Sequence, residues 1–167
     1  MRTQPFPSFG TLSVTNQTLT GNNATVATPL FRITGTVRLL KLYGVITTVL
    51  GSNNTAAYYR LNDQTAQVDI TLSTGTTLSS AAVGSVIAKK GLAAAAVILS
   101  TAAAGRILEP TTLETVYFGE FIMQQKTAGA NTDIEFVYTT TNTPTSGVIQ
   151  HFVLWEPISS GASLAVI

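Results

Sequence analysis

The sequence has no cysteine and very little charge. Its 167 residues include eight acidic and nine basic side chains, 10% of the chain, beside 45% hydrophobic residues. The absence of cysteine excludes a disulfide framework, a thiolate zinc site and a cysteine nucleophile. A net charge of +1 provides no extended positive field, so nucleic acid is not expected as a partner. Because average soluble domains carry about a quarter charged residues, this surface must consist of Thr, Ser, Asn and Gln or be covered by other protein.

No apolar stretch is long enough to cross a bilayer as a helix. The longest, residues 92–104, contains Ser100 and Thr101 and falls short of the ~20 residues that a span requires, so no membrane partner is expected. The first residues lack the apolar region of a secretory signal, which predicts a cytosolic translation product. A chain of this length can bury about 70% of its unfolded surface, enough for one core.

Short Thr- and Val-rich segments bounded by Gly, Asn and Ser follow one another from residue 11 onward, and helical periodicity is nearly absent. This pattern is typical of antiparallel strands in a sandwich or barrel. We therefore predict an all-β protein, with an arm at residues 1–10 and a single β-sandwich domain at 11–167. Thr34 and Gly35 are expected to form a bend. Strands are predicted at 12–19, 24–34, 36–50, 56–61, 66–72, 85–88, 94–100, 115–126, 132–140 and 147–155.

Three of these strands differ in how their apolar residues alternate. Residues 66–72 place Ala66, Val68, Ile70 and Leu72 on one face, which predicts a half-buried strand. Residues 37–49 and 148–155 are apolar on both faces, which indicates that one sheet meets a second chain. In the first, Val37, Leu39, Tyr43, Val45 and Val49 are predicted opposite Leu40, Leu42 and Ile46. In the second, Val148, Phe152 and Leu154 are predicted opposite Ile149, Val153 and Trp155.

Two segments leave alternatives open. The arm contains Pro5 and Pro7 with Phe6 and Phe9, and its aromatic rings either pack on a neighbouring molecule or close one end of their own domain. The alanine-rich segment 92–104 has no charge that would fix an amphipathic face, so a strand with a tight loop and a short buried helix both fit it.

Few residues offer reactive chemistry. His151 is the only histidine, lies in a strand pattern, and is interpreted as a sheet residue or an interface contact that makes assembly sensitive to pH. Asp133 and Glu135 share one face of a strand, a pattern compatible with a hard cation but more typical of a solvated strand edge. The aromatic residues Tyr58, Tyr59 and Trp155 fit core or interface packing, or a platform that stacks on sugar rings.

The sequence contains no Gly-x-Ser-x-Gly elbow, phosphate-binding glycine loop or dinucleotide fingerprint. An enzyme is therefore not expected, and no cofactor or metal is predicted.

Two segments resemble small structural proteins of tailed bacteriophages. Residues 33–48, ITGTVRLLKLYGVITT, resemble their "I-T-G-G-x-V-x-V" strand followed by "G-x-V-T-T". Residues 147–164, GVIQHFVLWEPISSGASL, resemble their final strand with its proline and small Gly-Ala-Ser tail. The chain departs from this pattern at Thr36, where a second glycine is expected, and at the Lys89-Lys90 pair with the alanine run. Together the two segments cover about a fifth of the chain.

The resemblance implies a jelly-roll-like β-sandwich that decorates the capsid exterior of a virion, assembled in the host cytoplasm. Such a protein bridges capsid subunits, so its implied partners are the major capsid protein and itself, as a homotrimer or homodimer. A tail or head-fibre module and a carbohydrate-binding module are the alternatives. The predicted interface residues are Phe6, Phe9, Tyr58, Tyr59, His151, Trp155, Leu164 and Ile167.

Overall fold

The computed structural model describes residues 10–21, 23–71, 73, 77–89, 97–100, 121–126, 131–141 and 146–167. Every regular element among them is a strand, which confirms the predicted all-β class. These residues include no helix able to span a membrane. The strands are β1 (Thr11–Thr18), β2 (Thr25–Thr34), β3 (Thr36–Thr48), β4 (Asn54–Asn62), β5 (Gln67–Asp69), β6 (Val86–Lys89), β7 (Val97–Ser100), β8 (Phe121–Gln124), β9 (Asp133–Thr140), β10 (Val148–Pro157) and β11 (Ser163–Val166).

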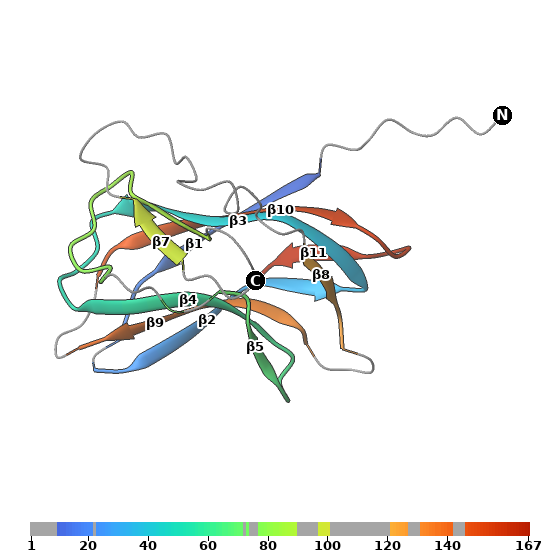
Figure 1. Cartoon of the computed structure of the whole chain (residues 1–167), viewed down its shortest axis with the longest axis horizontal. Helices are drawn as coiled ribbons and strands as arrows, with labels where there is room; N and C mark the ends of the chain where they lie inside the picture. Colours follow the sequence, from blue (N-terminus) through green and yellow to red (C-terminus); the bar gives the residue numbers. More distant parts are fainter. Residues whose placement is uncertain are drawn as a thin grey trace, which may run out of the picture.

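The strands form two antiparallel sheets that lie one above the other in Figure 1. The six-stranded sheet has the order β1-β10-β3-β6-β7, with β8 paired to β3. The five-stranded sheet has the order β11-β2-β9-β4-β5. Between them lies a core of aliphatic and aromatic side chains, whose largest fully buried members are Phe31, Tyr59, Phe136 and Tyr138. This is the arrangement of a β-sandwich.

A single residue carries the chain from one sheet to the other between β2 and β3. Gly35 has φ +67°, and a Cβ there would lie 2.7 Å from Ser159 Oγ. Only glycine adopts this conformation in this space without strain. The predicted bend at Thr34 and Gly35 is confirmed.

The two segments that carry the resemblance lie side by side, although residues 49–146 separate them in the chain. Residues 33–48 hold the end of β2 and all of β3, and residues 147–164 hold β10 and the start of β11. Strand β10 pairs with β3 in one sheet, while β11 pairs with β2 in the other. The two segments therefore form one corner of the sandwich across both sheets.

Strand β10 follows the predicted alternation. Ile149, Val153 and Trp155 are buried against the other sheet, and Val148, Phe152 and Leu154 are half-buried on the outer side. The prediction of two apolar faces is confirmed for this strand.

The predicted faces of β3 are wrong because a β-bulge changes the alternation within the strand. Leu154 pairs with Lys41 and Trp155 pairs with Leu39, so Leu40 has no partner on β10. An extra residue in one strand reverses the side to which all following side chains point. The inward residues are Val37, Leu39, Leu42 and Ile46, whereas Leu40, Tyr43 and Val45 lie on the outer face.

The prediction of a half-buried strand at residues 66–72 is wrong for residues 66–71, and Leu72 lies outside the described residues. The strand there, β5, covers three residues that are all exposed, and Val68 retains 62% exposure. The strand ends because the backbone N–H groups of Ile70 and Thr71 both donate to the carbonyl oxygen of Tyr59. The Thr71 hydroxyl in turn accepts from the Tyr59 N–H at 2.9 Å. These bonds draw Ile70 and Thr71, but not Ala66 or Val68, into the buried part of the protein.

Strand β11 was not predicted, because its sequence, SLAV, follows a Gly-Ala segment that is typical of a loop. Of the alanine-rich segment, only residues 97–100 are described, and they form β7, which pairs with β6. The rest of that segment and residues 1–9 of the predicted arm lie outside the described residues.

Candidate functional site

His151 lies between the two sheets and is hydrogen-bonded to both. It projects from β10 into the core, where it is fully buried. Its Nδ1 is 2.9 Å from the hydroxyl of Tyr59 on β4, and its Nε2 is 2.9 Å from Oε1 of Gln17 on β1. Because an amide oxygen can only accept, Nε2 carries the proton and Nδ1 accepts from the Tyr59 hydroxyl. We call Gln17, Tyr59 and His151 the inter-sheet cluster.

The surroundings keep this cluster neutral. Burial lowers the pKa of His151 to about 3 and raises the pKa of the Tyr59 hydroxyl. The ring of Phe136 lies 4.8 Å from the imidazole ring, centroid to centroid. With both ring nitrogens bonded and the ring enclosed, the imidazole can join the sheets but cannot reach a solute. Gln17 Nε2 and Ser85 Oγ are buried without a hydrogen-bond partner in the described structure.

Gly44 provides the space in which the hydrogen bond between Tyr59 and His151 forms. A Cβ at Gly44 would lie 2.9 Å from Ile149 Cγ2, 3.1 Å from the Tyr59 hydroxyl and 3.3 Å from His151 Nδ1. The glycine stands opposite His151 on the neighbouring strand β3. Its missing side chain therefore lets Tyr59 reach across from the other sheet.

Asp133 and Glu135 hold arginines on the outer face of the five-stranded sheet. Asp133 accepts from Arg32 Nε at 2.9 Å and from Nη2 at 3.1 Å. Glu135 accepts from Arg60 Nε at 2.6 Å and from Asn62 Nδ2 at 2.9 Å.

Both carboxylates are buried, because β9 lies in the middle of its sheet. The prediction of a solvated strand edge is therefore wrong for this pair. In the part of the chain that the structure describes, no group of His, Asp and Glu residues could hold a metal ion.

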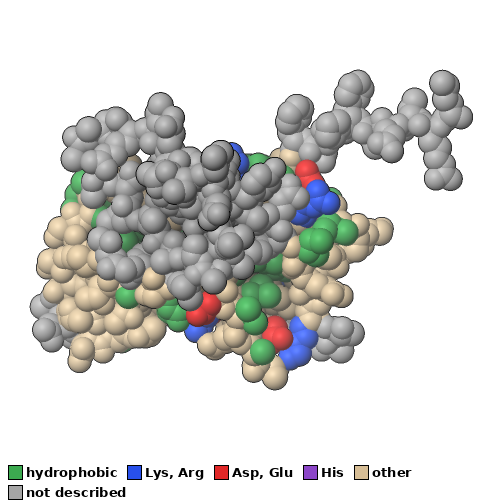
Figure 2. Space-filling view, in the orientation of Figure 1, with side chains coloured by type: hydrophobic (Ala, Val, Ile, Leu, Met, Phe, Trp, Pro, Cys, Tyr) green, Lys and Arg blue, Asp and Glu red, His purple; other side chains and the backbone are tan. Residues whose placement is uncertain are grey.

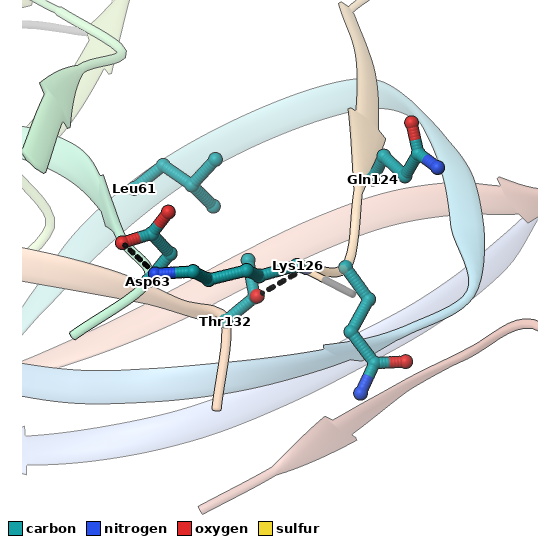
Figure 3. A pocket seen from close by; sticks show the side chains of 6 residues that line it. Leu61, Asp63, Gln124, Lys126 and Thr132 are labelled. Carbon is teal, nitrogen blue, oxygen red and sulfur yellow. Dashed lines mark hydrogen bonds and ion pairs between the residues drawn. The ribbon is translucent and has the colours of Figure 1, made fainter. Parts of the chain in front are cut away.

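A hollow of about 330 Å³ opens where β4 and β8 end (Figure 3). It is lined by Leu61, Asp63, Gln124, Gln125, Lys126 and Thr132. Its two charged side chains point toward each other, with Lys126 Nζ 3.6 Å from Asp63 Oδ1. The same carboxylate oxygen accepts from the N–H groups of Thr65 and Ala66, and these bonds lower the pKa of Asp63. The charges at this hollow are thus engaged in holding a turn.

The outer face of the six-stranded sheet carries apolar side chains on β1, β10 and β3, beside polar ones that include Gln150 and the Arg38–Glu156 ion pair. Tyr43 and Phe152 stack on it, with ring centroids 4.8 Å apart and planes 7° apart. Leu12 and Val14 of β1 are exposed by 55% and 36%. Exposed apolar side chains on a sheet face are suited to contact with protein. Figure 2 shows the sandwich from the side, in the orientation of Figure 1, with hydrophobic side chains beside a few acidic and basic ones on the described surface.

The structure divides the predicted interface residues into three groups. Tyr59, His151, Trp155 and Leu164 are buried within the chain, which contradicts a surface contact for these side chains in the folded protein. Tyr58 is half-buried on the outer face of the five-stranded sheet, and Ile167 is exposed by 51%. Phe6 and Phe9 lie outside the described residues. Because Tyr59 and Trp155 are buried, the three aromatic residues do not form a platform for sugar.

Several residues important to these sites were not singled out from the sequence. Gln17 and Gly44 look like ordinary strand residues, and only the pairing of β1, β10 and β3 brings them beside His151. The ion pairs of Arg32 and Arg60 could have been predicted from the sequence, since each arginine is one of few charged residues in a predicted strand. A charge in an apolar strand needs a partner, and two acidic residues at alternate positions of a third strand provide it.

A scan against protein-family models and searches of curated proteins and of solved structures found no match for this chain.

Proposed function

We propose that this chain is a structural protein of a tailed-bacteriophage virion, which decorates and stabilises the capsid by bridging its subunits. The observation that carries the proposal is the corner of the sandwich formed by residues 33–48 and 147–164. Both segments resemble such proteins, and β3 and β2 of the first pair with β10 and β11 of the second. The two segments that carry the resemblance are thus neighbours in the folded chain.

The strand pairing supports the jelly-roll part of the proposal. Strands β1 and β10, β2 and β9, β3 and β6, and β4 and β5 pair antiparallel as nested partners. A long antiparallel ribbon rolled into two sheets produces this nesting, and jelly rolls recur in viral capsid proteins. We therefore propose a jelly-roll fold, to which β7, β8 and β11 are additions.

The surface supports a role in assembly. The outer face of the six-stranded sheet presents Leu12 and Val14 beside the stacked Tyr43 and Phe152. The buried His151 has a structural role inside the sandwich, and the charges at the hollow near Lys126 are paired. A protein that binds a lattice through many modest contacts gains affinity from their number and needs no reactive group.

Electron microscopy of virions from the phage that encodes the chain tests the proposal, with gold-labelled antibodies against the purified protein. We expect label over the capsid surface. Label confined to the tail or to head fibres would support the alternative module, and virions without label would contradict both. A second assay adds the protein to capsids that lack it and measures the temperature at which their DNA is released. We expect this temperature to rise, with a heat-unfolded sample as the control.

A further inference from the structure

Among the described strands, β1 is an edge of the six-stranded sheet, with one side open to another strand. It pairs with β10 along one side, and no described strand pairs with the other. Within the described residues the other edge strands are short, with four residues in β7, β8 and β11 and three in β5. Short edges limit pairing between molecules. At eight residues, β1 is the exception.

The usual devices that protect a long edge are missing from β1. Its sequence, TLSVTNQT, has no charged residue and no proline. Its register with β10 runs from Thr11 to Thr18 without a bulge. Lysine, proline and bulges are the features by which proteins prevent pairing at an edge. The open edge of β1 is therefore regular and uncharged.

The pairing with β10 identifies which backbone groups of β1 point outward. Leu19 donates its N–H to Gly147 at 3.0 Å, so it faces β10. In an antiparallel pair, alternate residues turn both N–H and C=O toward the partner. Because the register is regular, the same alternation extends back from Leu19 along β1. Thr11, Ser13, Thr15 and Gln17 therefore direct their backbone N–H and C=O groups toward β10. Those of Leu12, Val14, Asn16 and Thr18 point to the open side. The side chains of these last four residues are also exposed.

We propose that β1 pairs antiparallel with β1 of a second copy about a two-fold axis, which joins the two six-stranded sheets into one. In an antiparallel pair, residues whose backbone groups point toward the partner strand lie opposite each other. The two registers that overlap most under this rule place Val14 opposite Val14 or opposite Asn16 of the second copy. The second copy fits because a neutral strand puts no like charges opposite each other. Leu12 and Val14 of both copies add apolar contact beside the new hydrogen bonds. The proposal does not depend on a role in the virion.

Light scattering on the full chain at micromolar to millimolar concentration tests this pairing. We expect twice the mass of one chain for the natural protein and the mass of one chain for Val14→Lys, since a lysine at an edge opposes pairing. The matched control is Val83→Lys, a similarly exposed valine in a turn, which should remain dimeric. A monomeric or trimeric natural protein would overturn the proposal, as would a folded Val14→Lys protein that stays dimeric.

Amide hydrogen exchange on the natural protein tests the same pairing without a substitution. In the dimer the amides of Leu12, Val14, Asn16 and Thr18 exchange as slowly as those of Ser13 and Thr15. On dilution to the monomer only the first set becomes fast. Fast exchange of this set in a confirmed dimer would place the contact elsewhere and overturn the proposal.

Discussion

The imidazole of His151 is enclosed between two sheets, where burial lowers its pKa to about 3 from an ordinary value of 6.5. The unfolded chain takes up a proton at this residue below pH 6.5, whereas the folded chain does so only near pH 3. The buried neutral imidazole therefore leaves the free energy of unfolding at its full value above pH 6.5, and this free energy decreases as the pH falls from 6.5 toward 3. The free energy of unfolding decreases by about 1.4 kcal/mol for each pH unit below 6.5, so the decrease is roughly 3 kcal/mol at pH 4.

Urea unfolding at pH 7 and pH 4 measures this dependence, with His151→Gln as the comparison. The variant loses about 1 to 3 kcal/mol at pH 7, because Tyr59 and Gln17 are left with poorer partners. Its stability then falls less between the two pH values than that of the natural protein, since no imidazole is protonated. The carboxylates titrate in both proteins, so the difference isolates His151. Parallel losses in the two proteins would contradict the assignment.

A second prediction at the residue scale concerns the space beside Gly44. We expect Gly44→Ala to lower the free energy of unfolding by about 1 to 3 kcal/mol, because its methyl group would lie close to the Tyr59 hydroxyl, His151 and Ile149. Tyr59→Phe removes the hydroxyl that is crowded. Urea unfolding of both single variants and the double variant should therefore show a smaller cost for Gly44→Ala in the Tyr59→Phe background. Costs that simply add would show that the hydroxyl does not limit the space.

Among the elements, β9 joins its two neighbours through buried charges, and this makes a graded prediction. Glu135 and its partner Arg60 have 6% and 14% of their side chains exposed, whereas Arg32, the partner of Asp133, has 39%. Removing one charge from an enclosed pair costs more than removing it from a partly solvated pair. We expect Glu135→Gln to cost about 2 to 3 kcal/mol and Asp133→Asn about 1 kcal/mol in urea unfolding at pH 7. Equal costs would contradict this ranking.

The elements also show how far the sequence alone leads. Alternating Thr- and Val-rich segments predicted ten strands, and the structure has a strand in each of these segments. The faces of β3 could not be predicted, because the bulge at Leu40 depends on its pairing with β10. The exposed β5 could not be predicted either, since the bonds from Ile70 and Thr71 to Tyr59 end it. Local patterns determine whether a strand forms, whereas pairing between distant strands determines which side is buried.

The candidate sites were less predictable than the strands for the same reason. His151 was expected in a sheet and is found there, but its partners are 92 and 134 residues away in the chain. Nothing in the composition of β1 identifies it as an edge, because the same eight residues would serve equally in the middle of a sheet. Only the strand order reveals the open side.

For the whole molecule, the proposed dimer and the proposed virion role together make a prediction that neither makes alone. A dimer joined through β1 presents two identical surfaces, so it can hold two capsid subunits at once. Linked contacts bind more tightly than single ones by a factor of about 10² to 10⁴. A monomeric Val14→Lys protein loses this gain, together with any contact that Val14 itself makes from the outer face of the sheet.

The measurement is the amount of protein retained on capsids that lack it, after dilution and washing, together with the temperature at which those capsids release DNA. We expect the natural protein and Val83→Lys to stay bound and to raise this temperature. Val14→Lys should bind only at much higher concentration and protect little. If Val14→Lys is a folded monomer and protects as well as the natural protein, then bridging does not use the β1 dimer, and each chain must contact two capsid subunits by itself.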